Sequence, residues 1–72
     1  MTTEEIIVVS LADAYPKEQA RLRELIAAYK EIPTGAFGAA MIEQTLKRAD
    51  KAAAEQDTIA MIRCYDEMRG CE

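Results

Sequence analysis

The apolar positions along the chain predict a series of helices. These helices are interrupted near Pro16, near Pro33 and at Gln56-Asp57. Residues 6–12 form a nearly continuous apolar block. The preceding Thr2-x-x-Glu5 fits a capping box, in which a threonine side chain satisfies backbone N–H groups at the start of a helix. The β-branched residues of the block also suit a buried strand, but no other segment has the pattern of a partner strand. We therefore predict a first helix at about residues 3–14.

Pro16 predicts a break after this block, because proline is favoured at the first position of a helix. A second helix is expected at about residues 16–31. Its apolar side chains recur at steps of three and four, which is the spacing of an amphipathic helix: Leu22, Leu25, Ile26, Tyr29 and Ile32.

The segment from Ile32 to Gly38 combines a proline, two glycines and the only phenylalanine of the chain. Pro33 disfavours helical geometry at Ile32, and glycine tolerates positive φ. We therefore predict a sharp turn here. Phe37 is expected to pack as a plug between the two halves of the molecule.

After this turn, a third helix is expected at about residues 36–55. Its predicted inner face comprises Phe37, Met41, Ile42, Leu46, Ala49 and Ala53. On its outer face Glu43 and Lys47 are spaced as an i,i+4 ion pair. A fourth helix is expected at about residues 58–69, with Asp57 as its N-cap and Gly70 as its stop.

These elements predict an all-α fold: a compact bundle of four short helices, arranged as two helical hairpins joined at the Pro33–Gly38 turn. Residues 1–72 are expected to form a single helical domain. Within it, residues 46–68 resemble one helical hairpin of a tetratricopeptide repeat, because small residues, a turn and an aromatic residue fall at similar offsets. The resemblance rests on Leu46, Ala49, Ala53, Gln56-Asp57, Met61, Tyr65 and Met68. It implies an antiparallel hairpin and nothing about function.

Composition and charge narrow the possible functions. Thirteen acidic residues against nine basic ones give a net charge of −4, and the chain has no histidine. Phosphate binding needs a basic face, so direct nucleic-acid binding is not expected. Without histidine, neither Ser-His nor Cys-His catalysis nor a histidine-containing metal site is possible. We therefore expect a protein that is not an enzyme and that uses no cofactor or metal.

The two cysteines, Cys64 and Cys71, are seven positions apart in or beside one predicted helix. Two helical turns separate residues by about 10 Å, beyond the reach of a disulfide. Both are expected to be free thiols in a reducing compartment, with Cys64 in the core. The acidic start is unlike a signal peptide, and residues 6–9 are too few to span a membrane. A cytoplasmic location is expected.

Two features point to a protein partner. The chain has many apolar and aromatic side chains for its size, in the 6–12 block and in its tyrosines and methionines. These side chains are either buried in the core or exposed as a contact surface, and the pattern alone leaves both possibilities open. The net negative charge permits binding to a protein whose surface is basic. Tyr15 and Tyr65 are candidate contact residues, because tyrosine is common at protein contact surfaces.

In size, acidity, helical pattern and lack of catalytic residues, the chain resembles small phage accessory proteins of the anti-CRISPR inhibitor type. That resemblance implies a protein that occupies a basic, nucleic-acid-binding surface of a complex in the host cytoplasm. It also implies that acidic side chains meet basic side chains of that surface, with these candidates: Glu43, Asp50, Glu55, Asp57, Asp66 and Glu67. The alternative is a self-associating structural or regulatory homodimer, in which the 3–14 helix packs against its copy. A third possibility is a small ligand bound in a pocket near Phe37 and the glycine turn.

Overall fold

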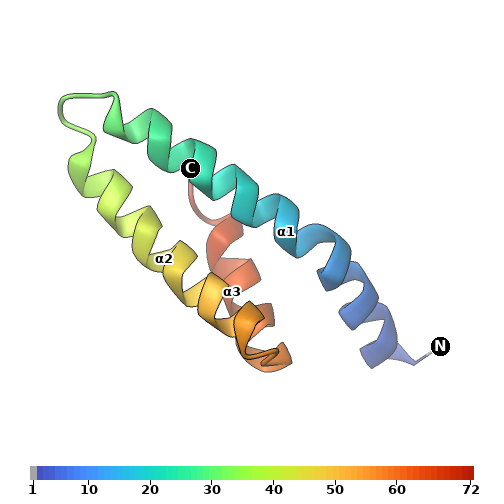
Figure 1. The fold of residues 1–72 in the computed structure, drawn as a ribbon. Coiled ribbons are helices and arrows are strands. Elements are labelled where there is room, and N and C mark those ends of the chain that lie inside the picture. Colours follow the sequence, from blue (N-terminus) through green and yellow to red (C-terminus); the bar gives the residue numbers. More distant parts are fainter. Residues whose placement is uncertain (1) are drawn as a thin grey trace.

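In a computed structural model the chain folds into three helices (Figure 1). The structure describes residues 2–72, without the side chain of Glu4. Helix α1 spans Thr3–Lys30, α2 spans Ala36–Ala54 and α3 spans Thr58–Arg69. The all-α prediction is confirmed. The four-helix bundle is wrong, because the two helices predicted at 3–14 and 16–31 are one.

Pro16 lies inside α1 and does not interrupt it. Proline removes one backbone donor, so the carbonyl of Ala12 loses its helical partner. Both Pro16 and Ala12 are exposed, which lets water satisfy that carbonyl. On the opposite side of α1, Leu11, Tyr15 and Leu22 are all buried. Because this packing holds the residues on both sides of Pro16 in the core, the helix continues through it.

The α1–α2 corner, residues 31–35, confirms the predicted turn, but it joins two helices of one hairpin and not two hairpins. Phe37 is not a plug: its side chain is 77% exposed, because it begins the outer face of α2. Gly35 is required for a reason other than positive φ, since neither glycine of the turn adopts it. A Cβ at Gly35 would lie 2.0 Å from the carbonyl oxygen of Tyr29, so only glycine allows the chain to pass this close.

The α2–α3 corner closes with a Schellman arrangement, in which two N–H groups beyond the helix bond back to carbonyls of its last turn. The N–H of Gln56 donates to the carbonyl of Ala53, and that of Asp57 to the carbonyl of Ala52, both at 3.1 Å. Gln56 takes the left-handed conformation that this arrangement needs, with φ 54°. The Asp57 side chain then caps α3 by accepting from the N–H of Ala60 at 3.2 Å, as predicted. The predicted span of α3 is confirmed.

The core lies where the three helices meet. Its buried apolar residues are Leu11, Tyr15, Leu22, Ile26, Ala39, Ile42, Leu46, Ala49, Ala52, Cys64 and Met68. Helix α3 folds back along α2 (Figure 1), and its end is fastened to α1 by Arg21. The Arg21 guanidinium donates to the carbonyls of Met68 and Cys71 at 2.6 and 2.9 Å. Tyr29 donates to the carbonyl of Glu72 beside it.

Candidate functional site: an apolar arm of α1

The N-terminal part of α1 extends beyond the helix that it packs against. Helix α1 has 28 residues and α2 has 19, which correspond to about 42 and about 28 Å of helix. The two run antiparallel from the corner at residues 31–35, so the excess length projects at the far end (Figure 1). We call residues 3–13 the arm.

Four consecutive apolar side chains of the arm are exposed and point in different directions around the helix. Ile6, Ile7, Val8 and Val9 are 51%, 44%, 44% and 58% exposed. Consecutive helical residues point about 100° apart, so four in a row cover the whole circumference. Of the larger side chains in the 6–12 block, Leu11 is the one that is buried, at 8% exposed. Most of the 6–12 block is therefore not used in the core of the chain, whereas Tyr15 and Met68 are.

One side of the arm continues the core-facing stripe of α1. Val8 precedes Leu11 by three positions and Tyr15 by seven, so the three lie on one face. Leu11 and Tyr15 are buried, whereas Val8 is not. The stripe therefore runs on past the point where α2 ends at Ala54.

A groove of about 270 Å³ lies between the arm and α3. It is lined by Ile6, Ile7, Ser10, Leu11, Ala14, Ile62 and Tyr65. Ile62 is 41% exposed, and Tyr65 is half-buried. The Arg69 guanidinium lies 5.9 Å from the centre of the Tyr65 ring, a cation–π contact that steadies one wall of the groove. Of the predicted contact residues, Tyr65 is thus placed on an accessible apolar surface.

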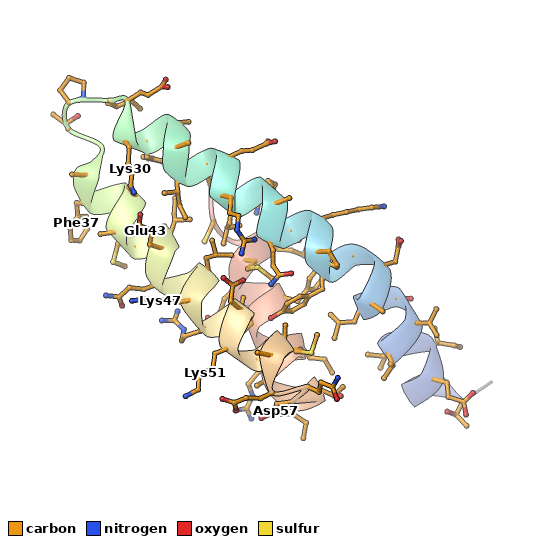
Figure 2. The ribbon with its side chains drawn as sticks, in the orientation of Figure 1. Lys30, Phe37, Glu43, Lys47, Lys51 and Asp57 are labelled. Atoms are coloured by element: carbon orange, nitrogen blue, oxygen red, sulfur yellow. The ribbon has the colours of Figure 1, made fainter. Side chains whose placement is uncertain are left out.

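The predicted acidic contact residues are spread along the interfaces between the helices. Glu43 accepts from Lys30 of α1 at 2.7 Å, and not from Lys47 as predicted, because α1 lies alongside it (Figure 2). Asp50 binds Arg23 through both carboxylate oxygens, at 3.0 and 3.1 Å. Both acids therefore join α1 to α2.

The remaining acids are divided between the α2–α3 interface and its corner. Glu67 pairs with Arg48 across this interface at 3.1 Å. Glu55 pairs with Lys51 at 3.8 Å, and Asp57 caps α3. Asp66 is exposed. Exposed pairs of this kind contribute about 0–1 kcal/mol each. The six acids do not form one continuous face.

Tyr15 is 1% exposed, so the prediction that it contacts a partner is wrong. The Tyr15 side chain faces the core, where its hydroxyl donates to the carbonyl of Ala49 at 2.7 Å. Burial, together with the nearby Cys64, raises the pKa of the Tyr15 phenol to about 12. Tyr15 is therefore a neutral core residue that ties α1 to α2.

Cys64 lies in the core, 7% exposed, as predicted. Burial and then the charge of Glu67 raise the pKa of its thiol. Because the thiolate is the reactive form, this environment suppresses nucleophilic chemistry at Cys64. Cys71 is half-buried, and both thiols are free, as predicted.

A second exposed apolar patch lies at the opposite end, around the α1–α2 corner. We call Ile32, Phe37 and Met41, which are 51%, 77% and 57% exposed, the tip. Met41 was predicted to face inward; its side chain is instead exposed, about one helical turn after Phe37 in α2. Phe37 projects into solvent.

Among the side chains that the structure describes, which exclude that of Glu4, no group of three acidic or cysteine residues is arranged to hold a metal ion. None of the three helices described for residues 2–72 is long and apolar enough to cross a membrane. No protein-family model, curated protein or solved structure matches this chain. The arm and its groove are therefore interpreted from their own geometry and chemistry.

Proposed function

We propose that this chain is a non-enzymatic protein-binding module that uses its apolar arm as the contact surface. The observation that carries the proposal is the exposure of four consecutive β-branched residues, Ile6 to Val9, on a helix that overhangs its own core. A helix that is apolar all round is ordinarily covered by protein or lipid. Exposed apolar patches on small proteins are common sites of protein contact.

The energetics favour a partner. A 72-residue chain lies near the lower limit for a single hydrophobic core. Burying the exposed part of Ile6 or Val9 would contribute on the order of 1 kcal/mol each at about 25 cal/mol per Å² of apolar area. Binding through the arm would thus bury apolar surface that the isolated fold leaves exposed to water.

The partner we propose has a basic surface, in keeping with the net charge of −4. Surfaces of that kind also bind nucleic acid. A protein that covered one would compete with nucleic acid for its target, which is the role implied by the resemblance to anti-CRISPR inhibitors.

A capture experiment with paired variants tests the proposal. Wild type, an arm variant (Ile6→Ser with Val9→Ser) and a tip variant (Phe37→Ser with Met41→Ser) are immobilised and exposed to a lysate of the source cells. Circular dichroism first establishes that all three are equally helical. We expect a protein that wild type and the tip variant retain and that the arm variant loses. Equal retention by all three would refute the proposal.

A further inference from the structure

We infer that the arm accepts one amphipathic helix of the partner, with an apolar stripe flanked by lysine or arginine. This inference rests on the proposed function and specifies the ligand of the same surface. It depends on three features: an open face on the core-facing stripe, an apolar side wall, and acidic side chains on the arm.

The core-facing stripe passes through Leu11 to Val8, and α2 ends at Ala54 before it reaches Val8. Val8 is 44% exposed, so this face of the arm is open to solvent. A partner helix packed there at the usual distance of about 8–10 Å would extend the α2 layer. Ile62 and Tyr65 of α3 provide the side wall through the 270 Å³ groove. A helix docked in such a groove is a recurring mode of peptide recognition.

The arm itself carries acidic and no basic side chains, while Arg69 of α3 lies against the Tyr65 wall. Residues 5–16 include two acids, Glu5 and Asp13, and no lysine or arginine. Glu5 is exposed near one end of the arm, and Asp13 near the other pairs with Lys17 at 3.5 Å with both side chains more than three-quarters exposed. The α2–α3 corner, with Glu55 and Asp57, lies at this same end of the molecule (Figure 2). Basic flanks on the incoming helix would complement these charges, which sets orientation and speeds association.

A second copy of the chain suits the same place poorly. An antiparallel pair centred on Val9 would place Glu5 of one copy against Asp13 of the other, twice by symmetry. Like charges brought together at an interface oppose pairing.

The test uses two synthetic peptides of about 18 residues, long enough for five helical turns. Both carry the same leucine stripe; one has lysine flanks and the other has glutamate flanks. Binding to the wild-type protein is followed by ¹⁵N NMR at about 50 mM and about 300 mM NaCl, because salt screens exposed charges. We expect the lysine peptide to bind roughly tenfold more tightly than the glutamate peptide in low salt, with the difference reduced in high salt. The chemical-shift changes that the lysine peptide causes in the protein should map to residues 5–12, Ile62 and Tyr65.

A charge-reversed variant provides a second test. Glu5→Lys with Asp13→Lys should weaken binding of the lysine peptide several-fold and strengthen binding of the glutamate peptide. Glu24→Lys with Glu31→Lys changes two exposed acids away from the arm, one within α1 and one at its C-cap, and should leave both affinities unchanged.

Equal affinity for the two peptides, or shifts that map to the tip, would overturn the inference. If neither peptide binds while the capture experiment still shows an arm-dependent partner, the inference fails and the proposed function stands. If the arm variant captures the same proteins as wild type, the proposed function itself fails.

Discussion

The hydroxyl of Tyr15 donates a 2.7 Å hydrogen bond to the backbone carbonyl of Ala49, and this contact lies close to where the α1–α2 hairpin ends. On one side of Tyr15 the core continues to Leu22 and Ile26. On the other side, α1 proceeds into the arm while α2 stops within five residues, at Ala54. Leu11 is the last buried residue of α1 on this side, so the exposed apolar part of the arm begins beyond it, at Val9.

Replacing Tyr15 by phenylalanine removes this hydrogen bond and leaves the ring in place. We expect a loss of about 1 kcal/mol in the free energy of unfolding, the usual net worth of one intramolecular hydrogen bond. Urea denaturation followed by circular dichroism measures it. A variant as stable as wild type would show that the contact does not fasten the hairpin.

The same residue predicts how stability falls at alkaline pH. The phenol has an ordinary pKa of 10.0 and a folded-state pKa of about 12, so the folded state holds its proton to higher pH than the unfolded chain. The stability from the neutral phenol is complete below pH 10 and decreases as pH rises toward 12, by about 2–3 kcal/mol. Unfolding curves at several pH values should show this loss in wild type and a smaller one in Tyr15→Phe. Parallel losses in the two proteins would contradict it.

Gly35→Ala should destabilise the α1–α2 corner strongly. The new Cβ would lie 2.0 Å from the Tyr29 carbonyl oxygen and 2.9 Å from its carbon, both backbone atoms that cannot rotate away. We expect a loss of about 1–3 kcal/mol or more, as for other overpacked sites. Gly70→Ala is the matched control, because its Cβ meets nothing closer than 3.4 Å. Similar melting temperatures for the two variants would rule out this account of the corner.

Pro16→Ala should stabilise the protein, because it restores a helical donor at an exposed position in the interior of α1. Proline costs up to about 3 kcal/mol relative to alanine inside a helix. We expect a higher melting temperature and unchanged helical content. A lower melting temperature would instead support two separate helices meeting at Pro16.

The arm should be dispensable for folding. Ile6→Ser with Val9→Ser changes side chains that are more than half exposed, so the free energy of unfolding should change by about 0.5 kcal/mol or less. Leu22→Ala, at a fully buried position of the same helix, should cost about 2–5 kcal/mol. A large loss in the arm variant would mean that these residues belong to the core.

Local patterns predicted helix type and most boundaries well. The Asp57 cap and the spacing of Met61, Tyr65 and Met68 specify α3 through nearby residues alone. The helix break predicted at Pro16 was wrong because the effect of a proline on a helix depends on where the proline lies. On the exposed side of a packed helix, the loss of one backbone hydrogen bond is tolerated. The continuous spacing from Val8 through Leu11 and Tyr15 to Leu22 was the signal that α1 does not break.

The candidate site could be predicted only in part. The 6–12 block was identified as an apolar surplus from composition and pattern. Its exposure depends on the difference in length between α1 and α2, which follows only when α1 is taken as one helix. The groove also needs Ile62 beside the arm, a contact between distant parts of the chain. Ion pairs such as Lys30–Glu43 likewise depend on how the helices are placed side by side.

The mass in solution, measured by light scattering over a hundredfold range of concentration, tests the central claim most directly. If the arm is a free surface that accepts another protein, the isolated chain should remain a monomer of 8.0 kDa throughout. A stable dimer that Ile6→Ser with Val9→Ser returns to monomer would contradict the claim, because the arms would then cover each other.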